Sequence, residues 1–186
     1  MGMDAYSSLS SAGQFEALLA YWHRLHEEEG GIPRRSILNP VAIRDLLPFI
    51  FLLERRAPDD LLVRLAGTAL DAISPMPMTG ANYLDLCPEG ARPLVSDMAT
   101  AVVSHPCGHR FKREATFHNG KSHEITTLSL PMTSEDGDCR YMVGVSASKT
   151  DLLPANIEPG RYVEVKVLQS EFVDLGYGVP DLPELG

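Results

Sequence analysis

The fold is decided by residues 110–132, RFKREATFHNGKSHEITTLSLPM. The first half alternates between apolar and polar positions, with Phe111 and Phe117 on one face, which is typical of a half-buried strand. Asn119-Gly120 follows, and this dipeptide is the strongest short signal for a tight hairpin turn. The second half is rich in Ile, Thr and Leu, of which Ile and Thr favour strands. The stretch therefore predicts two antiparallel strands joined by a short turn.

The segments on either side extend this pair into a sheet. Residues 140–148 alternate in the same way and make the pair a three-stranded meander. Upstream, two apolar runs on either side of the turn-rich segment 55–60 predict a separate hairpin. The predicted strands are residues 49–54, 61–66, 110–118, 122–132 and 140–148.

The region between the hairpin and the meander is predicted to be helical. Residues 68–93 contain so many Pro and Gly breakers that only short helical pieces can form, whereas residues 94–104 indicate one compact helix. Strands before and after such an insert are typical of an α+β domain. The pattern predicts a five-stranded antiparallel sheet of order 2-1-5-4-3. The inserted helices cover one face, with a cavity beneath them.

An N-terminal flanking helix is predicted for residues 14–29, because apolar residues recur at helical spacing until Gly30 and Gly31 end it. Its apolar stripe consists of Phe15, Leu18, Leu19, Trp22 and Leu25. The stripe packs either on the sheet of its own chain or against a second copy, because a large apolar patch needs cover. We expect a homodimer through this stripe, with simultaneous contact to the sheet left open.

The remaining segments flank one domain over residues 14–150. Residues 1–13 are expected to form a loose start. Residues 151–186 form a C-terminal extension with one strand candidate, in which Val163, Val165 and Val167 alternate with polar residues. The end from residue 170 is expected to be mobile. The extension is too short for an output domain, so we expect any signal to pass to a separate protein partner or through the C-terminal extension and the first helix.

Composition excludes several classes of function. The 186 residues carry a net charge of −9, and 44% of them are hydrophobic, which is typical of a globular domain with a substantial core. The acidic balance argues against a nucleic-acid partner, since phosphate binding needs a basic surface. Three scattered cysteines, no leader and no apolar run long enough for a membrane span indicate a reduced, cytoplasmic protein.

Two passages resemble a known family. RLAGTAL at residues 64–70 and MTGANYLDL at residues 78–86 are similar to the strand–glycine–helix passage and the following glycine motif of the PAS domain, a sensory and interaction module of bacterial signalling proteins. Four further pieces resemble stand-alone alphaproteobacterial PAS-like proteins: Tyr21-Trp22, residues 33–35, residues 46–48 and residues 128–131. The resemblance implies a PAS-like sensor or adaptor that acts through protein contacts, with dimerisation through the N-terminal helix.

The candidate ligand pocket lies between the helix at residues 94–104 and the last three strands. Its expected lining is Met98, Val102, His105, Phe111, Leu128, Leu130 and Met142. The polar strand residues Arg113, Glu124, Thr126 and Thr127 can also reach a cavity, but alternation alone does not decide which face they take. The expected ligand is a small apolar molecule.

No cofactor is assigned from the sequence. In flavin-binding light sensors of the PAS class a reactive Cys directly follows the Asn of a Gly-x-Asn-Cys passage. Tyr83 holds that place here, so flavin photochemistry is not expected. His105 is the candidate axial ligand for haem, which is not expected either. The spacing of His105, Cys107 and His109 fits no compact zinc pattern.

Recognisable catalytic motifs are missing from the sequence, including the nucleophile elbow, the zinc-protease motif and the phosphate-binding loop. We therefore expect a non-enzymatic sensor or adaptor that binds a small molecule, a protein partner or both. Two alternatives stay open. One is a small cavity enzyme that uses His105 or Glu124, and the other is an interaction protein whose cavity is filled by its own side chains.

Overall fold

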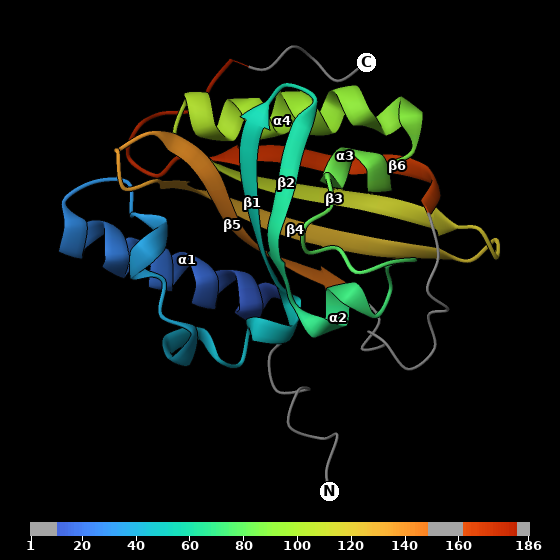
Figure 1. Ribbon diagram of the computed structural model, residues 1–186, viewed down its shortest axis with the longest axis horizontal. Helices are drawn as coiled ribbons and strands as arrows, with labels where there is room; N and C mark the ends of the chain where they lie inside the picture. Colours follow the sequence, from blue (N-terminus) through green and yellow to red (C-terminus); the bar gives the residue numbers. More distant parts are fainter. Residues whose placement is uncertain (1–10, 149–161, 182–186) are drawn as a thin grey trace, which may run out of the picture.

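Alternating strands around a helical insert produce one continuous sheet. The computed structural model describes residues 11–148 and 162–181. Within those residues six strands pair in the antiparallel order β2-β1-β5-β4-β3-β6 (Figure 1). The strands are β1 Ile50–Ala57, β2 Asp60–Ala66, β3 Gly108–Phe117, β4 Ser122–Thr133, β5 Cys139–Ser148 and β6 Tyr162–Val173.

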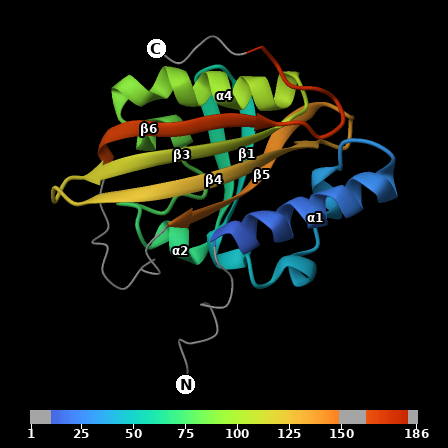
Figure 2. The same ribbon diagram turned by 180° about the vertical axis from the view of Figure 1, so that it is seen from behind.

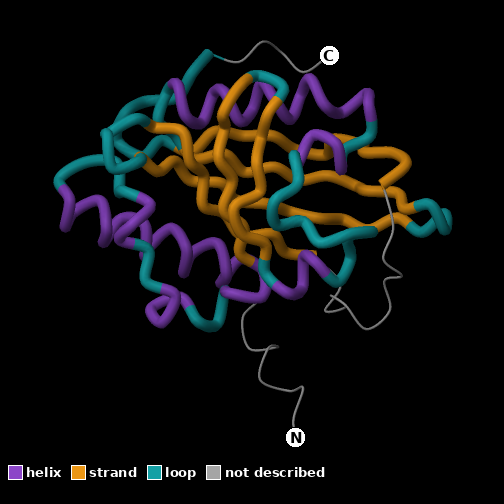
Figure 3. The backbone as a smooth tube through the Cα atoms, viewed as in Figure 1, coloured by secondary structure: helices purple, strands orange, loops and turns teal. Residues whose placement is uncertain are grey.

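Helices lie before the sheet and between β2 and β3 in the chain. The longer ones are α1 Ser11–Glu29 and α4 Arg92–Ser104, and the short ones are α2 Thr68–Asp71 and α3 Tyr83–Leu86. Single 3₁₀ turns are η2 Arg35–Ile37, η3 Pro40–Ile43, η4 Leu47–Phe49 and η5 Glu89–Ala91. The pieces between β2 and α4 are short and joined by loops, as the density of Pro and Gly predicts (Figure 3).

The predicted five-strand order is correct for its members but incomplete. β6 pairs along β3 and becomes a sixth strand at the edge of the sheet. The end of the chain also differs from the expectation of mobility, because residues 170–173 belong to β6. Beyond them, the Asp174 carboxylate accepts hydrogen bonds from the backbone amides of Gly176 and Gly178 at 2.8 and 2.9 Å. Of the loose start expected for residues 1–13, residues 11–13 belong to α1 instead, and residues 1–10 lie outside the described residues, as does the segment 149–161.

The two faces of the sheet carry two separate apolar cores. α1 lies across the face formed by β4, β5 and β1 (Figure 2), where it packs against such residues as Leu128, Leu130 and Val143. α4 and the short helices of the insert cover the other face, around Phe51 and Met142. Alternation along each strand divides the apolar side chains between these cores.

The stripe of α1 is buried within the chain itself. Leu18 and Trp22 are 0% and 1% exposed, and Phe15 and Leu25 are also buried. The indole Nε1 of Trp22 donates a hydrogen bond to the Pro131 carbonyl oxygen at 2.8 Å. Leu19 is half-buried against the same core. The assignment of this stripe to a homodimer interface is therefore corrected, because the apolar face of β4 and β5 already covers it.

Gly67 allows the short helix α2 to lie against η4. A side chain at this position would collide with the backbone carbonyls of Leu47 and Pro48, and the amide of Gly67 donates to the carbonyl of Ile50 at 2.7 Å. Close backbone approach, more than an unusual dihedral angle, explains the glycine of the strand–glycine–helix passage. No helix of the described residues has the length and apolar character needed to cross a membrane.

Candidate functional site

A cavity of about 140 Å³ lies between the sheet and the helical insert. Its walls come from β1, β2, β3, β4 and β5, from the short helices, from α4 and from Val165 of β6. Most of the lining is apolar, including Phe51, Leu53, Val63, Met98, Val102 and Met142. Such a surface suits the apolar body of a small ligand, because burial of that body removes it from water.

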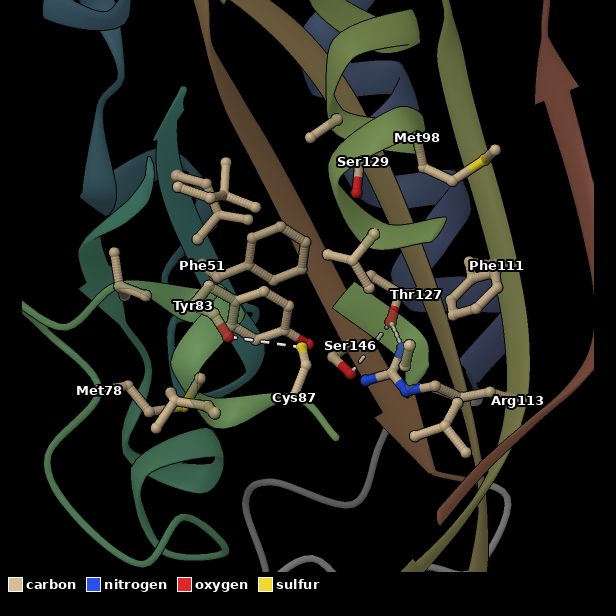
Figure 4. A pocket seen from close by; sticks show the side chains of 18 of the residues that line it. Phe51, Met78, Tyr83, Cys87, Met98, Phe111, Arg113, Thr127, Ser129 and Ser146 are labelled. Atoms are coloured by element: carbon tan, nitrogen blue, oxygen red, sulfur yellow. Dashed lines mark hydrogen bonds between the residues drawn. The ribbon is translucent and has the colours of Figure 1, made fainter. Parts of the chain in front are cut away.

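One side of the cavity is polar, and three adjacent strands contribute to it. Arg113 of β3, Thr127 of β4 and Ser146 of β5 point toward one another (Figure 4). Arg113 donates from Nη1 to Thr127 Oγ1 at 3.1 Å, and the hydroxyls of Thr127 and Ser146 are 3.4 Å apart. All three residues are buried, so this group, the polar corner, can interact with a ligand in the absence of bulk water.

A buried histidine joins the cavity to the edge strand. His109 lies on the cavity wall, and its Nε2 is 2.8 Å from the Ser170 hydroxyl of β6. The Ser170 hydroxyl lies 3.8 Å from the sulfur of Met98 on α4. The ring of His109 packs between those of Phe111 and Phe172. Burial lowers the pKa of His109 to about 4, so its imidazole is neutral at neutral pH.

The cysteine on the cavity wall is protonated at neutral pH. The Cys87 thiol donates to the Tyr83 carbonyl oxygen at 3.4 Å. Burial raises the pKa of Cys87 to about 11, although the nearby charge of Arg113 acts in the opposite direction. A thiol of this kind is a poor nucleophile.

Asn82 fixes the start of α3, which carries Tyr83 and ends just before Cys87. Its side-chain oxygen accepts from the amides of Leu61 and Leu84 at 3.0 and 3.2 Å, and its amide group donates to the Asp59 carbonyl at 2.8 Å. Asn82 thus acts as the N-cap of α3 and ties this helix to the β1–β2 hairpin.

The sequence-based lining agrees with the structure for one face only. Met98, Val102, Phe111 and Met142 lie on the cavity wall, and their role toward a ligand stays a prediction. Leu128 and Leu130 were assigned to the wrong face, because they pack against α1 on the other side of the sheet. His105 follows the last turn of α4 and is absent from the wall.

Several residues on the wall were not predicted from the sequence, or their face was left undecided. Arg113 and Thr127 were considered without a decision on their face, whereas Phe51, His109, Ser129 and Ser146 were not considered as lining residues. The alternation along β3 could have placed Arg113 on the cavity wall. Arg113 follows Phe111 by two positions and therefore shares its face. Register then pairs Phe111 with Thr127 and Thr127 with Ser146 across the sheet.

The cavity does not fit the bulky cofactors of light-sensing or haem-binding domains. A cavity of about 150 Å³ holds a benzene-sized molecule, which is far smaller than a three-ring flavin or a haem. Tyr83 also stands where the flavin-reactive cysteine would be, and His105 does not reach the wall. Among the described residues, no group of three or more His, Cys, Asp or Glu side chains is arranged to hold a metal ion.

An antiparallel sheet with helices packed on it and an internal apolar cavity defines a class of small α+β domains. The PAS domain family matches residues 11–147, and the chain belongs to this family of sensory domains. No curated protein matches the chain significantly.

Several solved structures are similar in fold. One is the VqmA–ligand–DNA complex of Vibrio cholerae, with 11% identity over 62% of this chain and 54% of that chain and a TM-score of 0.49. An RNA-binding light-oxygen-voltage receptor shows 17% identity over 64% and 36%, with a TM-score of 0.46. A fungal LOV domain photoreceptor shows 18% identity over 78% and 98%, with a TM-score of 0.43. The matched region spans a little over half the length of the VqmA chains.

The exclusion of nucleic acid from the partners is corrected by these likenesses. Two of the similar structures are described as a DNA complex and as an RNA-binding receptor. The net charge of −9 is a property of the whole chain and does not decide which partners a protein with this domain has.

Proposed function

We propose that this protein is a sensory domain that binds a small molecule in the cavity. Binding of that molecule changes the surface that a protein partner contacts. The observation that carries the proposal is the arrangement of the cavity wall, which is apolar except for the polar corner of Arg113, Thr127 and Ser146. An apolar lining with a few convergent polar groups is the usual composition of a small-molecule site. The protein partner and a cytoplasmic location remain predictions from the sequence.

The proposed route of the signal begins at Met98 in the middle of α4 and at His109 of β3, and it leads to β6. Met98 and His109 both face the cavity, and both contact the Ser170 side chain of β6. A ligand that moves either side chain changes how β6 is held at the edge of the sheet. β6 leads into residues 174–181, where a partner can read the change.

The experiment measures the melting temperature of the protein with small aromatic and branched aliphatic molecules. A molecule that binds only the folded state raises the melting temperature in a concentration-dependent way. Ala99→Leu fills the cavity from α4, because Ala99 is buried on its wall. We expect this variant to lose the ligand-induced shift.

The matched control is Ala101→Leu, which adds the same side chain to the same helix at a half-buried position off the cavity wall. It should keep the shift. If no molecule stabilises the wild-type protein, the sensory proposal fails and the interaction protein without a ligand takes its place. If Ala99→Leu and Ala101→Leu respond equally to the same molecule, that molecule binds outside the cavity.

A further inference from the structure

One serine hydroxyl on the cavity wall has no hydrogen-bond partner among the residues that the structure describes. It belongs to Ser129 of β4, a half-buried residue of the wall. The other two wall serines differ from it. Ser146 lies 3.4 Å from the Thr127 hydroxyl, and the Ser74 hydroxyl accepts from the amide of Met76 at 3.5 Å. A hydroxyl without a partner in an apolar cavity is unfavourable, so a ligand that supplies the partner gains affinity.

Two uncharged rings flank this hydroxyl. Ser129 pairs with His109 of β3 on one side and with Gly144 of β5 on the other. A methyl group at Gly144 would collide with the Phe51 ring, so that ring lies over the glycine and beside Ser129. His109 is neutral at neutral pH, since burial lowers its pKa to about 4. Burial of a charge between two such rings costs more than burial of a neutral polar group.

The charged group of the wall is held by contacts within the protein. Arg113 donates from Nη1 to Thr127 Oγ1 at 3.1 Å, and its central carbon lies 5.5 Å from the centre of the Phe111 ring. Ser129 follows Thr127 by two positions on the same strand, which is about 7 Å further along β4. The Ser129 hydroxyl is therefore a polar site separate from the polar corner.

The volume of the cavity limits the size of the ligand. About 140 Å³ is close to the roughly 150 Å³ of engineered cavities that hold benzene. Ser129 lies between Phe51 and Met98 in Figure 4, and both of these residues belong to the apolar part of the wall. A single ring or a short branched chain can fill this space while one polar group reaches Ser129.

The geometry points to an uncharged molecule of about one ring in size, with a single hydroxyl group, as the ligand class of this cavity. The ligand hydroxyl forms a hydrogen bond with Ser129, and the apolar body contacts Phe51 and Met98. Because a serine hydroxyl can both donate and accept, either direction of this hydrogen bond is available. This inference rests on the proposed function and adds the chemistry of the ligand to it.

The test compares phenol with toluene by isothermal titration calorimetry, because the two molecules differ only by a hydroxyl in place of a methyl group. Both probes are titrated into the wild type and into Ser129→Ala. The variant should bind phenol about fivefold more weakly and change toluene by less than about twofold. The ratio between the variant and the wild type removes the difference in hydration between the two probes.

Two matched controls locate the effect. Ser146→Ala removes a hydroxyl of the polar corner and should leave phenol binding within about twofold of the wild type. Ser104→Ala makes the same change at an exposed position off the wall and should have no effect.

A second variant and a third probe protect the test against misfolding. Ser129→Cys should also weaken phenol severalfold, because a thiol is a weak hydrogen-bond partner. Circular dichroism spectra establish which variants are folded, and the conclusion rests on those. Benzoate tests the charge of the ligand in the wild type alone, where it should bind more weakly than phenol.

The outcomes separate the two levels of inference. If Ser129→Ala changes phenol and toluene equally, the hydroxyl assignment is overturned while the cavity remains a ligand site. The assignment is also overturned if Ser146→Ala weakens phenol and Ser129→Ala does not. Tighter binding of benzoate than of phenol would show that the uncharged class is wrong. If phenol does not bind but other small molecules raise the melting temperature, the hydroxyl class is wrong. If nothing binds, the proposed function itself fails.

Discussion

His109 holds β3 and β6 together as a neutral side chain. Its ring is buried among Phe111 and Phe172 and contacts the Ser170 hydroxyl at 2.8 Å. Because a charged imidazole is disfavoured in such surroundings, burial lowers its pKa from 6.5 to about 4. Protonation of His109 is therefore coupled to the unfolding of the protein.

We predict that His109 makes the protein less stable as the pH falls from about 6.5 to 4. In this range the unfolded chain binds a proton on His109 that the folded protein does not. The contribution of the neutral ring is complete above pH 6.5 and is lost toward pH 4, by at most about 1.4 kcal/mol per pH unit. Urea unfolding at pH 7 and pH 5 should show a weaker pH dependence for His109→Gln than for the wild type.

The control for this measurement is Ser170→Ala, which removes the partner hydroxyl but keeps the titrating ring. It should retain most of the wild-type pH dependence. Equal pH dependence in His109→Gln and the wild type would mean that the ring takes up its proton in the folded protein without cost.

Single residues on β4 show where sequence reasoning succeeds and fails. The alternation in this strand was correct, and so was the presence of an apolar face with Leu128 and Leu130. The prediction that this apolar face lines the cavity was wrong. Leu128 and Leu130 are 1% and 0% exposed because they pack beneath α1. Thr127 and Ser129 face the cavity instead. One face of β4 contacts the cavity and the other contacts a helix. The sequence of the strand alone does not show which face has which contact, because both faces are buried.

At the scale of elements, β5 depends on a glycine at its centre. Gly144 pairs with Phe51 of β1 and Ser129 of β4. A methyl group at Gly144 would collide with the Phe51 ring and with the Leu128 carbonyl oxygen. The missing side chain of Gly144 thus makes room for the Phe51 ring, which also lies on the cavity wall.

We predict that Gly144→Ala both destabilises the protein and narrows the cavity. The collision should cost about 2 kcal/mol, because neither the ladder carbonyl nor a packed ring can move freely. Displacement of Phe51 should also reduce the shift in melting temperature caused by any cavity ligand. Gly90→Ala is the control, since a methyl group there meets no atom within 4 Å. A Gly144→Ala protein with wild-type stability and ligand response would contradict the prediction, because it would show that the Phe51 ring does not pack against Gly144.

Elements were easier to predict than their partners. Each strand of the meander was found from its own alternation and turns, and α4 from its spacing. β6 was recognised as a strand candidate through Val163, Val165 and Val167, but its place in the sheet was not. Its pairing with β3 joins residues about fifty positions apart, as in Ala115 with Val165, and no turn signal links them. Such a contact depends on which edge the finished sheet leaves open.

At the scale of the whole molecule, the sheet separates a structural core from a ligand cavity. α1 packs on one face of the sheet, whereas the cavity lies between the other face and the insert. Changes beneath α1 should therefore affect stability, whereas changes beneath the insert should affect binding as well. By this division α1 is part of the domain core. A substitution in the contact between α1 and the sheet tests that assignment most directly.

We predict that Trp22→Glu unfolds the protein or lowers its free energy of unfolding by at least about 4 kcal/mol. Trp22 is 1% exposed, and its indole donates to the Pro131 carbonyl at 2.8 Å. A glutamate there loses that hydrogen bond and places a carboxylate in an apolar core, where burial of a charge is costly. Ala20→Glu adds the same charge at an exposed position of the same helix and should remain near wild-type stability. Urea unfolding measures the stability, and light scattering measures the mass. A Trp22→Glu protein that stays folded while its mass falls to half would instead return α1 to a homodimer interface.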